Sequence, residues 1–338
     1  MSQHFEKPFR LSIAVPVHNE ESVLPELLRR LVGVVDQIAG GPHEFVFVDD
    51  GSTDGTREIL EDAASKDSRI VLIVLSRNFG HQAALSAALD HVSGDATVVM
   101  DADLQDAPEA IWAFVSKFMD GYDVVYAQRT KRKEPWWLRL CYKVFYRLIS
   151  ALADVRLPLD AGDFGLMSRR VVRLIRSMPE HHRYLRGLRG WVGFRQIGIH
   201  VERDTRHAGE SKYTSLRLFK LAFDGILSFS VAPIRAAAIL GLIAIGLSGS
   251  YTVYSAWMRL VLHRSPQGFA AIITVVTFLS GVQLLFLGVI GEYVGRIFEE
   301  MKARPIYIVA NVVRGGEQHR ALDRESDRSE VTSGITRA

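Results

Sequence analysis

The chain has 338 residues, of which 48% are hydrophobic and 23% are charged, and its formal net charge is +3. The length favours a catalytic domain with a further module, and the composition restricts any membrane portion to a minority of the chain. The small positive charge does not indicate a nucleic-acid partner, because the basic residues lie beside apolar and amphipathic stretches more than beside exposed aromatic residues. The single cysteine, Cys141, excludes an intramolecular disulfide and a metal site built from several thiolates.

Short β-rich runs alternate with longer helical runs from residue 11 onward. The pattern predicts strands at 11–17, 44–49, 70–75, 95–101 and 122–128. It predicts helices at 21–38, 79–91 and 108–119, and a further helix after the turn at 51–55. Val, Ile and Leu are nearly continuous in the strands, which is typical of burial on both faces. We therefore expect a Rossmann-like α/β domain with a mostly parallel sheet between two layers of helices.

Two long uncharged stretches follow this region. Residues 236–258 contain no charged residue over 23 positions, and residues 265–291 contain none over 27. Each stretch is long enough to cross a bilayer as a helix, and we predict transmembrane spans at 231–258 and 268–292 that form a hairpin. The alternative is a pair of buried core helices in a soluble domain.

The basic residues around the predicted hairpin indicate its orientation. Two Arg residues lie in the connection, whereas seven Lys or Arg residues lie on the outer flanks: Arg217, Lys220, Arg235, Arg296, Lys302, Arg304 and Arg314. This asymmetry predicts that both termini are cytoplasmic. The apolar run near the N-terminus is too short for a signal-peptide core, so we expect residues 1–213 to form a catalytic domain on the cytoplasmic face of the cell inner membrane.

Two amphipathic stretches, 136–151 and 214–230, mix aromatic and aliphatic residues with Arg and Lys at helical spacing. We predict that they are interfacial helices, with helices packed on the sheet as the alternative. A short β-like run at 305–313 follows the second span. The C-terminal tail, 293–338, is expected in the cytoplasm and is expected to be disordered after about residue 314.

The segment Asp101-Ala102-Asp103-Leu104-Gln105-Asp106 directly follows a predicted apolar strand. Ligands of open α/β sheets bind at the carboxyl ends of the strands, where these carboxylates fall. Hard oxygen ligands in a D-x-D pattern suit Mg²⁺ or Mn²⁺ bridging a diphosphate, and such a metal would act as a Lewis acid on a departing nucleoside diphosphate. The alternative is a solvated acidic turn, which the preceding buried strand and Gln105 disfavour.

Two further loops follow predicted strands and converge on the same edge. Asp49 and Asp50 end the second strand, where they would accept hydrogen bonds from a ribose or a pyrimidine N–H. Ser52 and Asp54 alternatively cap the next helix. The segment containing His18 and Glu20 follows the first strand. No G-x-G-x-x-G follows the first strand and no P-loop motif occurs, so dinucleotide and P-loop sites are disfavoured.

These motifs together resemble those of the family 2 glycosyltransferases with a GT-A fold. Within that family they resemble the polyprenyl-phosphate glycosyltransferases related to dolichol-phosphate mannose synthase and bactoprenol glucosyltransferases. The resemblance covers about residues 10 to 310 and rests on six motifs in this order, followed by the two predicted spans: VPVHNE (15–20), VDDGSTDGT (48–56), RNFGHQAAL (77–85), DADLQD (101–106), DAGDFGLMSR (160–169) and RHAGESKY (206–213).

The resemblance implies a role for particular residues of these motifs. The first two motifs bind the nucleotide in that family, which implies Pro16, His18, Glu20, Asp49 and Asp50, with Asp101 and Ala102 against the nucleotide. Asp101, Asp103 and Gln105 would hold the metal and the diphosphate, and Asp103 would be catalytic. Arg129, Arg206 and Lys212 match positions that contact donor or acceptor phosphates. Asp163 matches the catalytic carboxylate.

The role of Asp163 stays open at this point. A lipid phosphate that attacks a sugar carbon is already mostly anionic at neutral pH, because the second pKa of a phosphate monoester is about 6. A strong general base is therefore not required, and Asp163 would instead orient the acceptor or the sugar. A purely structural alternative is that it caps the turn before Leu166.

The resemblance implies an inverting, metal-dependent transfer of a hexose from a nucleotide sugar to polyprenyl (undecaprenyl) phosphate at the cytoplasmic membrane face. The expected cofactor is Mg²⁺ or Mn²⁺, a UDP-sugar is favoured over a GDP-sugar, and UDP-glucose is the favoured donor. Relatives suggest a homotetramer. A processive polysaccharide synthase is the alternative enzyme, but it usually carries Q-x-x-R-W, of which only Arg189-Gly190-Trp191 is a distant echo. A scaffold without catalysis would be expected to lose the D-x-D carboxylates, which are present.

Overall fold

The computed structural model of the protein describes residues 8–129, 161–181, 183–201, 232–261, 268–315 and 317–320. The chain divides into two units. The first contains residues 1–142, 155–212 and 305–338, and the second contains residues 143–154 and 213–304. The segment after residue 304 therefore belongs to the same unit as the N-terminal strands.

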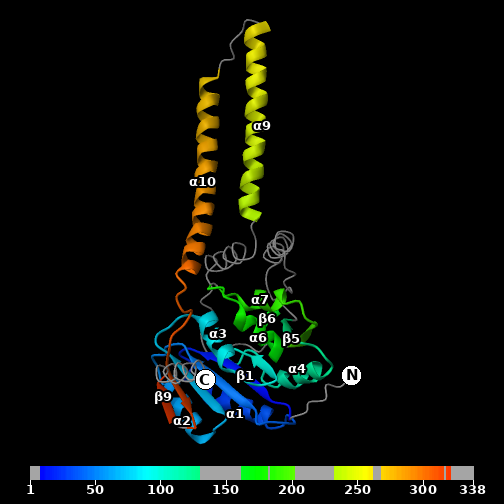
Figure 1. The fold of residues 1–338 in the computed structure, drawn as a ribbon, viewed down its shortest axis with the longest axis vertical. Helices are drawn as coiled ribbons and strands as arrows, with labels where there is room; N and C mark the ends of the chain where they lie inside the picture. Colours follow the sequence, from blue (N-terminus) through cyan, green and yellow to red (C-terminus); the bar gives the residue numbers. More distant parts are fainter. Residues whose placement is uncertain are drawn as a thin grey trace, which may run out of the picture. The chain divides into compact units, whose positions relative to one another are not determined.

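A mixed sheet of nine strands forms the centre of the first unit in the described residues (Figure 1). Its spatial order is β7 (Gln196–Val201), β5 (Val124–Arg129), β6 (Ala161–Ser168), β4 (Ala96–Val99), β1 (Leu11–Val17), β2 (Glu44–Asp49), β3 (Ile70–Leu75), β8 (Val309–Arg314) and β9 (Glu317–Arg320). The four strands β4, β1, β2 and β3 are parallel. Strand β6 is antiparallel to β4 and β5, and β8 is antiparallel to β3 and β9.

Helices cover both faces of this sheet. Helices α1 (Leu24–Val35), α2 (Thr56–Lys66) and α4 (Ala110–Met119) contribute buried side chains to one core cluster. Helices α3 (His81–His91), α6 (Arg169–Ser177) and α7 (Leu185–Trp191) contribute to a second. Alternate residues of β2 belong to the two clusters, because successive side chains of a strand point to opposite faces. Both faces of the central strands are therefore buried, as their composition predicts.

The predicted α/β class is confirmed, and the strands expected at 11–17, 44–49 and 70–75 are confirmed residue by residue. The prediction of a mostly parallel sheet holds for the four central strands and for the edge pair β5–β7, whereas β6 and β8 run antiparallel to their neighbours. The antiparallel strand β6 was not predicted, because Gly162, Asp163 and Gly165 dilute its apolar pattern. A Cβ atom at Gly165 would lie 2.5 Å from the carbonyl oxygen of Val125, so the approach of β5 requires glycine at this position.

The segment after residue 304 adds two strands to the sheet. Val312 and Val313 of β8 are buried where β8 pairs with β3, in the β-like run that the sequence predicts. Tyr307, just before β8, donates a hydrogen bond to Asp90 at the end of α3. The sequence predicts disorder after about residue 314, whereas the structure has β9 there, because β8 offers a free edge with which the following residues pair.

The second unit contains two long helices, α9 (Ala232–Val261) and α10 (Phe269–Met301), which contact each other (Figure 1). Within the described residues, one segment, Phe278–Met301, is long and apolar enough to cross a membrane by length and composition. The apolar part of α9, Ile239–Tyr254, is shorter. The two-span hairpin thus stays a prediction. The predicted interfacial helices at 136–151 and 214–230 lie outside the described residues.

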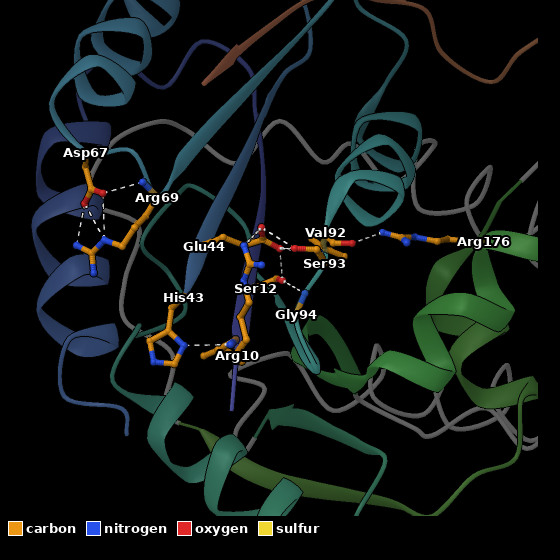
Figure 2. A network of polar contacts seen from close by, with 11 residues as sticks. Arg10, Ser12, His43, Glu44, Asp67, Arg69, Val92, Ser93, Gly94 and Arg176 are labelled. Carbon is orange, nitrogen blue, oxygen red and sulfur yellow. Dashed lines mark hydrogen bonds and ion pairs between the residues drawn. The ribbon is translucent and has the colours of Figure 1, made fainter. Parts of the chain in front are cut away.

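A buried carboxylate joins the amino ends of the central strands, at the sheet edge opposite the D-x-D segment. Glu44, at the start of β2, accepts hydrogen bonds from the Ser12 hydroxyl at 2.5 Å and from the backbone N–H of Ser93 at 2.6 Å (Figure 2). Arg10 pairs with the same carboxylate at 2.9 Å, and Ser12 accepts a hydrogen bond from the N–H of Gly94. This network aligns β1, β2 and the loop that precedes β4.

We expect Glu44→Ala to lower the free energy of unfolding by about 2–3 kcal/mol, because it leaves several buried donors without an acceptor. For a domain of this size that corresponds to a fall in Tm of roughly 4–12 °C. Thermal unfolding of the purified protein in detergent measures the shift. The matched control is Glu26→Ala, which removes an exposed ion pair with Arg29 and should change Tm by about 2 °C or less. Equal shifts for the two variants would contradict a structural role for the network.

Candidate active site

The loops after β1 and β2 are bonded to each other at the carboxyl edge of the sheet. Asn19 donates its backbone N–H to the Ser52 hydroxyl at 3.0 Å, and its side-chain oxygen accepts the N–H of Thr53 at 2.8 Å. The N–H of Glu20 is donated to the Thr56 hydroxyl at 2.8 Å. Asn19 has a φ of 56°, a left-handed conformation that asparagine tolerates better than most residues. The two sequence motifs therefore form one continuous surface.

Asp49 and Asp50 are buried at the end of β2 and accept backbone hydrogen bonds. The two oxygens of Asp50 accept the N–H groups of Phe79 and Gly80 at 2.7 and 2.9 Å, and Asp49 accepts the N–H of Ser52 at 2.9 Å. Burial raises the pKa of Asp50, and these two N–H donors act in the opposite direction. Asp50 thus holds the loop that leads into α3. The predicted nucleotide contacts of both residues stay predictions.

The D-x-D turn alternates buried anchors with carboxylates that face the site. Met100, Ala102 and Leu104 are buried, whereas Asp101 and Asp103 are half-buried. Leu104 has a φ of 53°, and Asp103 accepts the N–H of Gln105 at 3.1 Å, so the turn is locally closed. The apolar side chains fix the turn in the core, and the carboxylates between them remain accessible to a ligand.

One oxygen of the Asp101 carboxylate lacks a hydrogen-bond donor in the described part of the chain. Its Oδ1 atom is buried and accepts no hydrogen bond within the described residues, although 31% of its side chain is exposed. Burial raises its pKa, and the nearby carboxylates of Asp163, Asp103 and Asp106 add to the rise. A buried anionic oxygen without a donor is stabilised by a cation. The described residues contain no group of three or more His, Cys, Asp or Glu that would hold a metal alone, so diphosphate oxygens and water would have to complete the coordination.

A second carboxylate from a distant part of the chain lies close to Asp101. His81, the first residue of α3, has its Nε2 atom 3.5 Å from Asp101 Oδ1 and 3.7 Å from Asp163 Oδ2. Asp163 lies on β6, and only 6% of its side chain is exposed. Burial alone lowers the pKa of His81, but Asp163 and Asp101 outweigh it and raise the pKa. The imidazole therefore lies between two carboxylates.

Arg186 of α7 binds both oxygens of Asp163. Its Nε atom lies 2.7 Å from Oδ1 and its Nη2 atom 2.8 Å from Oδ2, which is a forked ion pair. Burial raises the pKa of Asp163, but His81 and Arg186 outweigh that effect, and the pKa falls below its usual range. Burial lowers the pKa of Arg186, but the same ion pair outweighs it and raises the pKa. Asp163 is thus a permanently ionised carboxylate and a poor proton acceptor.

A second guanidinium lies beneath this pair. Arg189 is 4% exposed and donates to the carbonyl oxygens of Gly162 at 3.0 Å and of Asp163 at 3.5 Å. Its charge lies over the Tyr126 ring, 5.4 Å from the centroid. Burial lowers the pKa of Arg189 to about 10, which still leaves it charged at neutral pH. Arg189 therefore fixes the backbone of β6 at the residue that carries the carboxylate.

The predicted site residues have different outcomes. Asp101 and Asp163 come together through His81, whereas Pro16 is buried in β1 and His18 is exposed beside Asn19. Arg129 ends β5, but its side chain lies outside the described part of the chain, as do Arg206 and Lys212. Sequence reasoning assigned no role to His81 or Arg186. The only sequence signal for His81 is that it lies within the motif RNFGHQAAL (77–85). Arg186 lies in none of the six motifs.

The chain is similar to several known proteins. The family model described as "Glycosyl transferase family 2" matches residues 12–175. The uncharacterized glycosyltransferase YkcC of Bacillus subtilis is 44% identical over 310 residues, covering 91% of this chain and 94% of its own length. The SfII prophage-derived bactoprenol glucosyl transferase of Shigella flexneri is 38% identical over 310 residues, covering 90% of this chain and 99% of its own. Among solved structures, S. aureus TarS residues 1–349 in complex with UDP-GlcNAc is similar with a TM-score of 0.45 and 20% identity, covering 65% of this chain and 67% of that one.

Proposed function

Because the chain belongs to glycosyltransferase family 2, we propose that it transfers a hexose from a nucleotide sugar to polyprenyl phosphate. Relatives named bactoprenol glucosyl transferases, similar over nearly the whole chain, support a lipid-linked acceptor and a glucosyl donor. The observation that carries the proposal is the meeting of Asp101 with Asp163 through His81 at the carboxyl edge of the sheet. Asp101 is proposed to act on the departing diphosphate, and Asp163 is proposed to act on the acceptor side.

A divalent metal fits the D-x-D turn. Asp101 and Asp103 would hold Mg²⁺ or Mn²⁺ together with diphosphate oxygens, which matches the preference of Mg²⁺ for one or two carboxylates plus substrate phosphates. When bound, the metal would neutralise charge on the departing nucleoside diphosphate. The Oδ1 atom of Asp101, which accepts no hydrogen bond within the described residues and lies 3.5 Å from His81 Nε2, supports this assignment, because a metal cation would stabilise it. Gln105 closes the turn beside them.

The proposed transfer inverts the configuration at the sugar carbon. An anionic oxygen of the polyprenyl phosphate forms a bond to C1 from the face opposite the nucleotide. The bond between C1 and the diphosphate oxygen breaks, and its electron pair leaves with the nucleoside diphosphate. The phosphate is already ionised, so no proton has to move. Asp163, with its lowered pKa, is suited to orienting groups and not to accepting a proton.

The proposed donor is UDP-glucose. His18, Glu20, Asp49 and Asp50 are proposed to bind the nucleotide, with the buried residues Pro16 and Ala102 as apolar support. Arg129, Arg206 and Lys212 are proposed to contact phosphates of the donor or acceptor. UDP is preferred to GDP by similarity to the glucosyl transferases alone.

The proposed location is the cell inner membrane, with two spans and both termini in the cytoplasm. Helix α9 has 30 residues and α10 has 33, which at about 1.5 Å per residue exceeds the roughly 30 Å of a hydrocarbon core. The apolar segment Phe278–Met301 supports at least one span. A homotetramer remains part of the proposal, and cross-linking in native membranes measures it.

The function is tested by incubating the full-length protein with radiolabelled nucleotide sugars and undecaprenyl phosphate. We expect label from UDP-glucose to enter a butanol-extractable lipid, and EDTA to abolish the transfer until Mg²⁺ or Mn²⁺ is added back. Label in an aqueous polymer would instead identify a polysaccharide synthase. Failure of every nucleotide sugar to label lipid would contradict the proposal.

A further inference from the structure

Arg186 has hydrogen-bonding capacity that its ion pair does not use. The pair with Asp163 engages Nε and Nη2, and the Nη1 nitrogen makes no hydrogen bond to any residue of the described chain. Asp163 is buried, whereas 33% of the Arg186 side chain is exposed. The guanidinium is therefore anchored on one edge and open on the other. An anchored guanidinium loses little side-chain freedom when it binds an anion, which makes such a group a strong anion ligand.

Positive charge around Asp163 exceeds what the carboxylate alone requires. Arg186 neutralises Asp163 with two hydrogen bonds, and Arg189 adds a second guanidinium beneath it. His81 lies between Asp163 and Asp101. The surplus positive charge on the Arg186 side of the cluster favours the binding of a further anion.

We propose that Arg186 binds the phosphate of the polyprenyl acceptor, with Asp163 as the residue that positions Arg186. This inference rests on the proposed function and names the acceptor contact within it. In an inverting displacement the nucleophile and the leaving group lie on opposite faces of the sugar. Asp101 and Asp103 are proposed to serve the leaving diphosphate, and His81 separates Asp101 from the Asp163–Arg186 pair. Arg186 is thus on the side from which the acceptor oxygen attacks.

This assignment also explains why a carboxylate is tolerated beside an anionic nucleophile. A bare Asp163 would repel the incoming phosphate, but both of its oxygens are covered by Arg186. The carboxylate acts through the guanidinium that it holds. The forming bond joins a phosphate oxygen to C1, the bond from C1 to the diphosphate breaks with its electron pair, and Arg186 remains paired with the phosphate throughout.

The experiment compares Arg186→Gln and Arg186→Lys with the wild-type protein in steady-state transfer. Undecaprenyl phosphate and the shorter farnesyl phosphate are the acceptors, and UDP-glucose is the donor. We expect Arg186→Gln to raise the KM for either acceptor by about tenfold to a hundredfold, because a charge-assisted hydrogen bond is lost. The KM for UDP-glucose should change by about twofold or less. Arg186→Lys should recover part of the acceptor KM, because a point charge still attracts phosphate.

A matched control lies at the opposite end of β6. Just after that end, Arg170 of α6 forms the same forked pair with the buried Asp123, remote from Asp163. Arg170→Gln should lower Tm by an amount similar to Arg186→Gln and leave both KM values unchanged. Asp163→Asn, which loosens Arg186 but retains it, should raise the acceptor KM by less than Arg186→Gln does.

Three results would overturn the proposal while wild-type transfer is intact. The first is an acceptor KM within twofold of wild type in Arg186→Gln with only kcat reduced, which would make Arg186 a support for Asp163. The second is a rise in the KM for UDP-glucose instead, which would assign Arg186 to the donor diphosphate. The third is an equal rise in acceptor KM for Arg170→Gln. Absence of lipid transfer by the wild-type protein would instead refute the proposed function, so the two failures are distinguishable.

Discussion

Asp103→Ala is expected to lower sugar transfer by about a thousandfold or more, while the protein still inserts into membranes and unfolds at nearly the same temperature. The reason is that the D-x-D turn is held by Met100, Ala102 and Leu104, whose burial does not depend on the carboxylate. Loss of an electrostatic group that acts on the leaving group lowers kcat by about a hundredfold to a thousandfold, and loss of the metal lowers kcat further. Asp101→Asn should have an effect of similar size, because it removes the charge from the orphaned oxygen.

The measurement pairs the transfer assay with Mn²⁺ binding followed by electron paramagnetic resonance in the presence of UDP. Wild-type protein should bind Mn²⁺ with UDP, and both variants should bind it at least about tenfold more weakly. Asp120→Asn, which alters an exposed carboxylate paired with Lys117, serves as the control and should behave as wild type. Retained turnover in Asp103→Ala would refute a metal role for the turn.

Gly165→Ala is expected to destabilise the first unit by about 3 kcal/mol or more, which corresponds to a fall in Tm of roughly 6–12 °C. An added Cβ would lie 2.5 Å from the Val125 carbonyl oxygen and 3.0 Å from the Tyr126 Cα atom. Both are backbone atoms of β5, so neither can rotate away, and β5 and β6 would have to separate. Because Asp163 lies two residues earlier on β6, transfer should fall as well.

Gly33→Ala is the control for this prediction. Gly33 lies in α1, and a Cβ atom added there would meet nothing within 4 Å. The added methyl should therefore leave Tm unchanged or raise it slightly, since alanine favours a helix. Fluorescence-monitored unfolding compares the two variants with wild type. A Tm for Gly165→Ala within about 2 °C of wild type would show that the two strands accommodate a side chain.

Local patterns allowed much of the fold to be predicted. Strands β1, β2 and β3 are continuous apolar runs bounded by polar turns, and their limits follow directly from that contrast. Strand β6 was missed, since Gly165 serves the approach of β5 and Gly162 adds no apolar side chain to the pattern. The pairing of β8 with β3 depends on a segment that returns to the sheet more than 230 residues later, and no local signal encodes that partner.

The candidate site, like the fold, could be predicted from local patterns only in part. The motifs themselves determined which side chains follow strands β1, β2 and β4, because a strand that ends in polar residues places them at the carboxyl edge of a parallel sheet. The family membership follows from those motifs and is confirmed by the relatives. The sequence alone also indicated that an anionic acceptor needs no strong base, because that conclusion depends on phosphate chemistry and requires no coordinates.

Only the tertiary structure decided which charges meet. His81, Asp101, Asp163 and Arg186 come from α3, the turn after β4, β6 and α7, and their contacts arise because β6 inserts between β4 and β5. The ionisation of Asp163 is a consequence of that packing, since its neighbours and its burial together determine its pKa. Residue types in sequence specify what each side chain is able to do, whereas the charge it carries depends on partners that only the folded sheet brings within a few ångströms.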